Sequence, residues 1–371
     1  MLPAVAPAPL LPAFGSGSLP DVVPALLDRR AGTPPWLPAE LGEARQVVLL
    51  VLDGLGWNQL RARPALTPTM TSLAGGPITS VAPSTTACAL ASIALGVPPA
   101  VHGLVGYRMV VSEGKILNLL RWRTSEGDAR LTWPPAEVQP LTSFLGRDVP
   151  AVTQSLYAGT GFTTAHLSGA RLCGWRTPSG IAVTVRRLLE EGNDFVYAYY
   201  PGLDTVAHEH GFGEHYDAEL QATDVLVAQV AAALPPGAAL VVTADHGQVE
   251  VDDRIVHLDP AVAGAVRFQS GEGRFRWLHV APGATEDTVA AGRELHGDQA
   301  WVVSREQVID EGWFGGRLAA HVEARLGDVA VVAHAPVAFY DPDETGSSSM
   351  RCRHGSMTPD EMLVPLLAHL S

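Results

Sequence analysis

Acidic side chains stand at three places where the pattern predicts that a buried strand ends. Asp53 directly follows the apolar run Gln46–Leu52, Asp245 closely follows Ala239–Thr243, and Asp204 comes shortly after a third strand-like run. A continuous apolar run is typical of a strand that is buried on both faces of an α/β sheet. Because α/β proteins bind ligands at the carboxyl ends of such strands, we expect these carboxylates to lie at a ligand-binding edge.

Histidines accompany two of these aspartates. Asp204 and His208 are one helical turn apart, so on a helix they share a face and can bind one ion. Asp245 and His246 are adjacent, so they converge only at a strand end or turn. His354 precedes another Gly-Ser turn. Each residue alone could be a solvated side chain, but the joint pattern of carboxylates and imidazoles favours a two-metal site of zinc, manganese or iron(II).

The stretch Pro83–Cys88 offers a serine and two threonines between an apolar run and an Ala/Leu/Ile segment that stops at Gly96. This pattern predicts a strand, a sharp turn and the start of a helix. The unpaired N–H groups of a helix N-terminus favour a phosphate, so a hydroxyl here could meet a phosphorylated substrate. The alternative is that Ser84 or Thr85 only caps the helix.

The rest of the chain predicts one domain over residues 39–371 behind a proline-rich, mostly irregular leader over residues 1–38. A small inserted lobe is expected within residues 250–345, followed by a Gly/Ser loop at Thr345–Ser349. The other expected elements are a short leader helix near Val22–Leu27, a hairpin excursion within 108–150, a strand at Gly161–His166, a helix around Val183–Glu191 and a C-terminal helix from about Pro359.

Composition limits the classes of partner. The chain has 371 residues, of which 47% are hydrophobic and 17% charged, as in a folded globular protein. The net charge of −14 argues against binding a nucleic-acid polymer. A small phosphorylated substrate remains possible, because metal ions can supply local positive charge. We expect a monomer or homodimer.

Cysteine usage and the N-terminus predict a cytoplasmic protein. The three cysteines are far apart and lack any CxxC pairing, which favours a reducing compartment. No lysine or arginine precedes Arg29, so the charged region of a signal peptide is missing. No apolar run reaches the length of a membrane span, so no membrane partner is expected.

Taken in order, these motifs resemble the type I phosphodiesterase/nucleotide pyrophosphatase family of the alkaline phosphatase superfamily, from about Val47 to Leu367. The family's nucleophile motif is Pro-x-x-Thr, followed after ten residues by Gly and after six more by His-Gly. Pro83, Thr86, Gly96 and His102 keep both spacings. The resemblance therefore implies that the nucleophile is Thr86 and not its neighbour.

The same resemblance implies the metal ligands and the fold. One of two divalent ions, zinc or manganese, would be held by Asp204, His208 and His354. The other would be held by Asp53, Asp245, His246 and the Thr86 oxygen. The implied architecture is an alkaline-phosphatase-like three-layer α/β fold, with a central, mostly parallel sheet flanked by helices and a small inserted lobe.

One position departs from the family pattern. Many members carry a phosphate-binding Asn twenty-one residues after the nucleophile, where this chain has Tyr107. We expect Tyr107 to contact the substrate, and the alternative is a core or lid tyrosine. The nucleophile stretch also lacks the Cys-x-Pro-x-Arg motif of sulfatases and the arginine with which classical alkaline phosphatases grip a monoester. The first absence argues against a sulfatase, and the second favours a diester substrate.

The resemblance implies hydrolysis of nucleotide phosphodiester bonds through a phosphothreonine-type intermediate, giving nucleoside 5′-monophosphates. The chain is similar to compact actinobacterial-type members, among which are enzymes that cleave cyclic di-AMP to pApA and AMP, so cyclic di-AMP is the leading specific substrate. The alternatives are a nucleotide pyrophosphatase that acts on ATP or dinucleotide cofactors, phosphonate hydrolysis at the same site, and a non-catalytic metal- or nucleotide-binding module.

Overall fold

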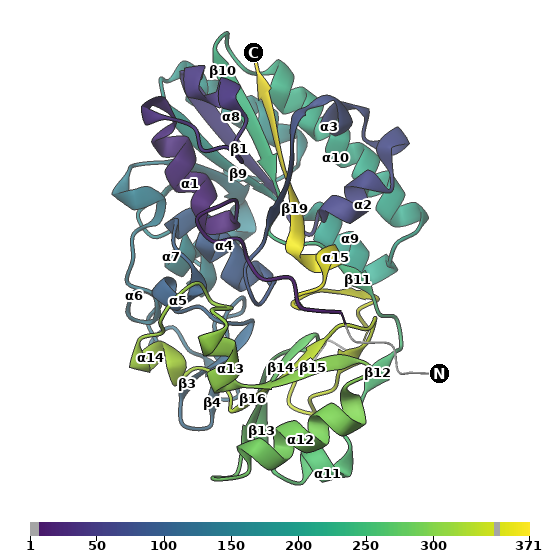
Figure 1. Cartoon of the computed structure of the whole chain (residues 1–371). Helices are drawn as coiled ribbons and strands as arrows, with labels where there is room; N and C mark the ends of the chain where they lie inside the picture. The colour runs from purple at the N-terminus through teal and green to yellow at the C-terminus, as the bar shows by residue number, and fades with distance from the viewer. Residues whose placement is uncertain (1–6, 345–348) are drawn as a thin grey trace.

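The computed structural model describes residues 7–344 and 349–371. Residues 1–6 of the expected leader and 345–348 of the expected Gly/Ser loop lie outside the described residues. The described chain forms a large sheet between two sets of helices, with a smaller lobe beyond one end of the sheet (Figure 1). This arrangement is the predicted α/β class.

The central sheet has seven strands in the order β2-β19-β10-β1-β9-β7-β8. The pairs β10–β1, β1–β9, β9–β7 and β7–β8 are parallel, whereas β19 runs antiparallel to β10 and β2. Six of the seven β1 residues are buried, which explains their continuous apolar run. The strands are β1 Gln46–Leu52, β2 Ala74–Thr79, β7 Pro150–Gln154, β8 Arg171–Trp175, β9 Phe195–Tyr200, β10 Ala238–Thr243 and β19 Leu363–Leu370.

Helices cover both faces of this sheet (Figure 1). One set is α1 Leu19–Leu27, α4 Thr86–Leu95 and α7 Gly161–His166, and the other includes α3 Pro68–Ser72, α8 Ser179–Glu190, α9 Gly202–His210 and α10 Glu214–Ala232. Helix α1 starts three residues before the predicted leader helix and packs on α4. Because Leu19, Val22 and Leu26 are fully buried there, this part of the leader belongs to the hydrophobic core.

Two predicted elements are wrong. Gly161–His166 is a helix rather than a strand, because the Thr160 hydroxyl accepts a hydrogen bond from the Thr163 N–H and caps it. The predicted C-terminal helix stops after one turn, α15 Pro359–Met362, and the chain continues as strand β19 between β10 and β2. A short apolar run does not by itself distinguish a buried strand from a buried helix.

The smaller lobe is a four-stranded antiparallel sheet with helix α12 Thr285–His296 packed on it (Figure 1). Its strands, in spatial order, are β13 Val266–Glu272, β14 Phe275–Val280, β16 Val329–Ala333 and β15 Ala300–Ser304. A separate antiparallel sheet occupies the start of the predicted excursion. It consists of β3 Arg108–Ser112, β4 Lys115–Asn118, β5 Arg123–Thr124 and β6 Gly127–Asp128.

A buried ion pair joins the smaller lobe to the C-terminal part of the main sheet. The Arg274 guanidinium, beside β14, donates to both oxygens of Glu361 in α15 at 2.6 and 2.8 Å. Both side chains are fully buried. Glu361 also accepts from the Ser356 N–H and the Thr358 hydroxyl, which fixes the loop before α15. Among the described residues, no helix combines the length and apolarity that crossing a membrane would need.

Candidate active site

The first cluster of predicted ligands lies at the carboxyl ends of β1 and β10. These strands are parallel neighbours, so Asp53 and the pair Asp245–His246 meet at one edge of the sheet. The His246 Nε2 atom is 3.5 Å from Asp53 Oδ1 and 3.3 Å from Asp245 Oδ2. All three side chains are buried, and we call them the deep cluster.

Two oxygens of the deep cluster suit a cation. Asp53 Oδ1 and Asp245 Oδ2 are buried and lack hydrogen-bond partners. Their sister oxygens are occupied: Asp53 Oδ2 accepts from the Tyr199 hydroxyl, and Asp245 Oδ1 accepts from the N–H groups of Gly54 and His246 at 3.0 Å. A buried carboxylate oxygen without a donor is costly, and a divalent ion would supply the missing charge and ligation.

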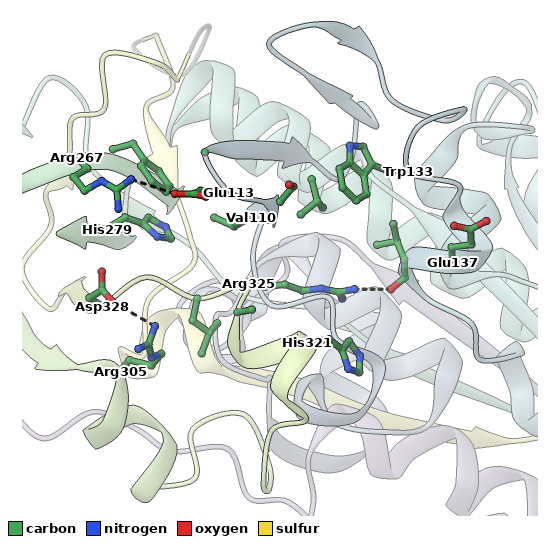
Figure 2. Close-up of a pocket in the computed structure, with 17 residues that line it drawn as sticks. Val110, Glu113, Trp133, Glu137, Arg267, His279, Arg305, His321, Arg325 and Asp328 are labelled. Carbon is green, nitrogen blue, oxygen red and sulfur yellow. Dashed lines mark hydrogen bonds and ion pairs between the residues drawn. The ribbon is translucent and has the colours of Figure 1, made fainter. Parts of the chain in front are cut away.

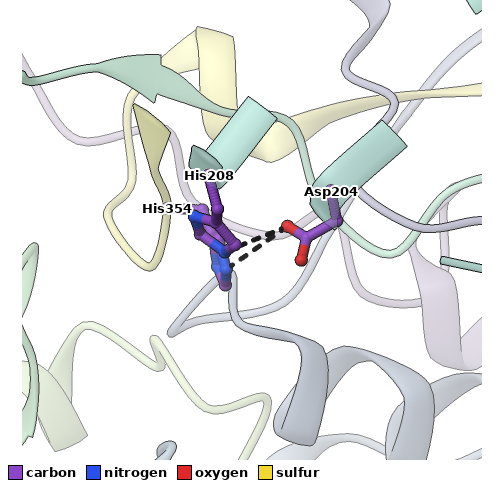
Figure 3. A group of neighbouring side chains, drawn as sticks. All are labelled: Asp204, His208 and His354. Carbon is purple, nitrogen blue, oxygen red and sulfur yellow. Dashed lines mark ion pairs between the residues drawn. The ribbon is translucent and has the colours of Figure 1, made fainter. Parts of the chain in front are cut away.

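The second cluster contains Asp204 and His208 from α9, together with His354 from the loop after β18 (Cys352–Arg353). The imidazole Nε2 atoms of His208 and His354 lie 3.3 and 3.8 Å from Asp204 Oδ1 (Figure 3). The predicted helical turn between Asp204 and His208 is present. The three side chains are between 11% and 19% exposed, and we call them the outer cluster.

Each histidine of the two clusters turns one ring nitrogen, Nε2, toward the site. Each Nδ1 faces a backbone carbonyl, which can only accept, so Nδ1 carries the hydrogen and Nε2 keeps its lone pair. The Nδ1 atom of His208 lies 2.7 Å from the Cys352 carbonyl oxygen. That of His354 lies 3.1 Å from the Ser84 oxygen, and that of His246 lies 3.0 Å from the Gly247 oxygen. The rings of His246 and His354 stack with centroids 3.6 Å apart, so the two clusters adjoin.

Burial perturbs the protonation of both clusters. It raises the pKa of Asp53 well above the usual value, and the charges of Asp245 and Asp204 raise it further. Burial is also the main cause of the raised pKa of Asp204 and of Asp245. Burial lowers the pKa of His246, and it lowers the pKa of His354 strongly, so both rings are neutral. Neutral imidazoles and mutually repelling carboxylates are a donor set that fits divalent cations.

Thr86 is the hydroxyl that reaches these ligands. It is the first residue of α4, and its Oγ1 lies 3.1 Å from His246 Nε2. The side chain of Thr85 makes no capping hydrogen bond, and the Ser84 hydroxyl donates to the Ser356 carbonyl at 2.6 Å. The capping alternative is therefore not seen, and Thr86 stands at a helix N-terminus where backbone N–H groups can bind a phosphate.

The motif spacing after Thr86 sets the length of α4. Gly96 ends the helix in a left-handed conformation (φ +67°), and a Cβ there would lie 2.9 Å from Pro24 Cγ of α1. His102 then returns to the helix, with its Nε2 2.9 Å from the Ser92 hydroxyl. These contacts hold α4, and therefore Thr86, in place.

Two cavities open on either side of Thr86, and Leu120 and Asp204 line both. The first, of about 200 Å³, extends from the outer cluster toward Tyr107 and Arg121, and we call it the polar cavity. The second, of about 190 Å³, lies beside Asp53 and carries the aromatic rings of Tyr157, Phe162, Tyr197 and Tyr199, and we call it the aromatic cavity. A group held at Thr86 therefore has room for a substituent on each side.

A larger cavity of about 550 Å³ lies elsewhere, between the β3–β4 hairpin and the smaller lobe (Figure 2). None of the predicted ligands lines it. Its guanidinium groups already have partners: Arg267 lies 3.7 Å from Glu113, Arg305 lies 3.4 Å from Asp328, and Arg325 donates to the Val138 carbonyl at 3.1 Å (Figure 2). It is not the site of the predicted chemistry.

Four residues at the site were not singled out from the sequence. Tyr199 binds Asp53 from β9, whereas Asn118, Arg121 and Glu272 line cavities around Tyr107. Glu272 accepts from the Tyr107 N–H at 2.9 Å, and burial raises the pKa of this carboxyl to about 8. The β9 run is rich in aromatics throughout, and the other three residues stand in hairpins without a motif, so no local signal separates them.

The fold and the two clusters define an α/β protein whose site is suited to two divalent ions. The type I phosphodiesterase/nucleotide pyrophosphatase family matches residues 47–357, and the chain belongs to this family. The resemblance drawn from the motifs is confirmed at this level. Among curated protein sequences, none matches the chain.

Solved structures support the fold. Murine ectonucleotide pyrophosphatase/phosphodiesterase 5 is 14% identical, with a TM-score of 0.65 and coverage of 88% of each chain. An inactive threonine-to-alanine variant of that enzyme, in complex with AMP, has a TM-score of 0.63 at 14% identity and again covers 88% of each chain. Phosphonoacetate hydrolase from Sinorhizobium meliloti 1021, in complex with phosphonoformate, is 18% identical with a TM-score of 0.63, covering 88% of this chain and 90% of its own. The predicted alkaline-phosphatase-like fold is confirmed.

Proposed function

We propose that this protein hydrolyses nucleotide phosphodiester bonds through a covalent intermediate on Thr86 and releases nucleoside 5′-monophosphates. The observation that carries the proposal is the position of Thr86 Oγ1, at a helix N-terminus, beside the deep cluster and between two cavities. The deep cluster and Thr86 would hold one ion, and the outer cluster the other. Residues 39–371, together with the buried leader helix α1, would act as one catalytic domain, with the smaller lobe as its insertion.

Two divalent ions, zinc or manganese, would lower the pKa of the Thr86 hydroxyl and neutralise charge on the phosphate when bound. Thr86 Oγ1 attacks phosphorus and loses its proton to solvent, and the bond to the departing nucleoside oxygen breaks as that oxygen takes up a proton. Water then attacks the phosphothreonine, breaks the bond between phosphorus and Thr86 and restores the hydroxyl. Positioning does most of the work in such phosphoryl transfers.

Tyr107 stands where many family members carry a phosphate-binding Asn, and it lines the polar cavity with Thr86. We assign its hydroxyl as a hydrogen-bond donor to a non-bridging oxygen of the reacting phosphate. Burial raises the pKa of Tyr107, so the phenol stays protonated and able to donate.

The specific substrate that we propose is cyclic di-AMP, cleaved to pApA and AMP. A dinucleotide needs room for a nucleoside on each side of the reacting phosphate, and the two cavities at Thr86 offer that. The tyrosine and phenylalanine rings of the aromatic cavity suit a stacked base. Relatives lend support, since the inactive threonine-to-alanine variant of the murine enzyme was solved with AMP. All three cysteines are unpaired, which supports a cytoplasmic nucleotide as substrate.

Turnover of bis-p-nitrophenyl phosphate tests the chemistry. We expect activity that EDTA abolishes and that Mn²⁺ or Zn²⁺ restores. Thr86→Ala should remove it while both ions remain bound, measured by metal analysis, because the other ligands are intact. Full activity of metal-loaded Thr86→Ala would refute the mechanism, and no turnover by the metal-loaded wild type would favour a binding module.

Product analysis then tests the substrate. A panel of cyclic di-AMP, linear dinucleotides, ATP, dinucleotide cofactors and phosphonoacetate should give the highest kcat/KM with cyclic di-AMP. A preference for ATP or for dinucleotide cofactors would indicate a nucleotide pyrophosphatase instead.

A further inference from the structure

The turn between β4 and β5 places the positively charged side chain of Arg121 at the mouth of the polar cavity. Arg121 lines this cavity together with the outer cluster and Tyr107, and its side chain is exposed. Among the described residues, no carboxylate forms an ion pair with its guanidinium, whereas Arg108 and Arg276 nearby pair with Asp341. Arg121 is therefore a charge available to a ligand.

The backbone that carries Arg121 is held from two sides. The Arg121 N–H donates to Asn118 Oδ1 at 3.0 Å. The next residue, Trp122, is buried, and its indole N–H donates to the Trp133 carbonyl at 2.7 Å. A Cβ at Gly161 would collide with the Trp122 ring, so the turn sits closely on α7. The turn is thus positioned before any ligand arrives, which reduces the entropy lost on binding.

Asn118 also sets the direction of hydrogen bonding at the Tyr107 hydroxyl. Because a backbone N–H can only donate, the contact with Arg121 identifies Oδ1 as the acceptor and leaves the amide nitrogen facing Tyr107. That nitrogen donates to the Tyr107 hydroxyl at 2.6 Å. The hydroxyl therefore accepts from Asn118, and its own hydrogen is free for the cavity.

The acidic groups of the polar cavity do not cancel Arg121. Glu344 pairs with Arg276 at 2.6 Å. Glu272 is 7% exposed, and burial raises its pKa to about 8, so it is mostly uncharged at neutral pH. The remaining acidic side chain of the cavity, Asp204, belongs to the outer cluster. An anionic group of a ligand would meet the positive charge of Arg121 at this mouth.

We propose that Arg121 binds a second phosphate of the substrate, and that Asn118 positions both Arg121 and Tyr107. This inference rests on the proposed diesterase function. In it, the reacting phosphate lies at Thr86, the departing half extends over the outer cluster, and the second phosphate reaches the guanidinium at the mouth. Arg121 would then select substrates with two phosphates over those with one.

The test compares a substrate with two phosphates and a substrate with one. Arg121→Ala should lower kcat/KM for cyclic di-AMP about 10- to 100-fold, chiefly through KM, and leave bis-p-nitrophenyl phosphate within about twofold. Arg123→Ala is the matched control, since this exposed arginine two residues away does not line the polar cavity. Equal losses with both substrates, or no loss, would overturn the role of Arg121.

A binding measurement separates this inference from the proposed function. In a Thr86→Ala background, Arg121→Ala should weaken cyclic di-AMP binding by a similar factor and leave AMP binding unchanged, measured by calorimetry. Unchanged affinity for cyclic di-AMP would reject the subsite even if turnover is normal. Failure of the wild type to turn over either diester would reject the function, while this comparison would still decide on the subsite.

Asn118 has a separate readout as a positioning residue. Asn118→Ala should lower kcat with both substrates to the level of Tyr107→Phe, and should raise KM only for cyclic di-AMP. Arg121→Ala should then raise the KM for cyclic di-AMP by a smaller factor in the Asn118→Ala background than in the wild type, because the guanidinium is already misplaced. Additive losses would show that Asn118 does not position Arg121.

Discussion

The deep and outer clusters have similar ligands but are built in different ways. The deep cluster stands on two adjacent strands at the centre of the sheet, and its side chains are at most 3% exposed. The outer cluster joins helix α9 to a loop near the C-terminus, and solvent reaches it from the polar cavity. The deep cluster is therefore fixed by the core of the sheet, while the outer cluster depends on how a loop far along the chain packs.

This difference suits the two roles proposed for the clusters. The deep cluster lies against Thr86, where a rigid and dry environment favours activation of a hydroxyl. The outer cluster lines the polar cavity, through which the leaving group would depart and water would enter in the proposed mechanism.

The largest effect is expected from replacing one carboxylate in each cluster. Asp245→Asn and Asp204→Asn should each lower kcat by about a thousandfold or more, because each removes a charged ligand from a site that needs both ions. Metal analysis should distinguish them, with Asp245→Asn losing the deep ion and Asp204→Asn losing the outer ion. Asp245→Asn should also weaken the hydrogen bonds that Asp245 accepts from the N–H groups of Gly54 and His246. Near-normal activity of either variant would contradict the two-ion site.

A smaller effect should come from the ion pair that fixes the outer loop. Arg274→Met leaves Glu361 buried without its partner, so the free energy of unfolding should fall by about 3 to 5 kcal/mol. Because Glu361 also holds Ser356, two residues after His354, the outer ion should bind more weakly and the deep ion normally. Chemical unfolding and metal titration measure the two effects.

Arg305→Met is the matched control for that variant. Its ion pairs with Asp328 and Glu323 are partly exposed, so their loss should cost about 1 kcal/mol or less. If both variants lost equal stability, the buried pair would not be the link between the lobe and the loop.

The smallest effect is a difference in how the clusters respond to pH. The raised pKa of Asp53, Asp245 and Asp204 means that protons compete with metal, so affinity for Zn²⁺ should fall as the pH falls. The deep cluster has two such carboxyls and the outer cluster has one. The affinity for Zn²⁺ should therefore fall more steeply with falling pH at the deep cluster. Zinc competition titrations between about pH 5 and pH 8 measure this.

The stability of the metal-free protein should also depend on pH. A carboxyl whose pKa is raised by folding favours the folded state most at low pH, below its unfolded value, and that contribution is lost as the pH rises toward the folded value. In the metal-free protein the three raised carboxyls therefore favour folding less as the pH rises over this range, whereas the buried His246 and His354, whose pKa values are lowered, favour it more. Asp245→Asn removes one raised carboxyl, so its metal-free stability should rise more steeply with pH than that of the wild type, and an unchanged pH dependence would contradict the raised pKa of Asp245.

Much of the fold could be predicted because its central strands are buried on both faces. The runs before Asp53 and Asp245 became β1 and β10, and the four-residue spacing of Asp204 and His208 became one turn of α9. The hydrophobic pattern gave the wrong element at Gly161–His166 and at the C-terminus, where short apolar segments are compatible with either a helix or a strand. Tertiary neighbours decided those cases.

The sequence by itself determined the candidate ligand types and the strand ends that carry Asp53 and Asp245, and the family motif that it resembles singled out Thr86 as the candidate nucleophile from the spacing to Gly96. These are local properties, because strand burial and helical turns relate residues that are close in the chain. Only the tertiary structure decided that Tyr199 binds Asp53 and that Asn118 joins Tyr107 to Arg121. The meeting of His354 with Asp204 was implied by the family resemblance, and no spacing in the chain predicts it. Those contacts depend on how loops and strands pack on one another, which sequence periodicity does not encode.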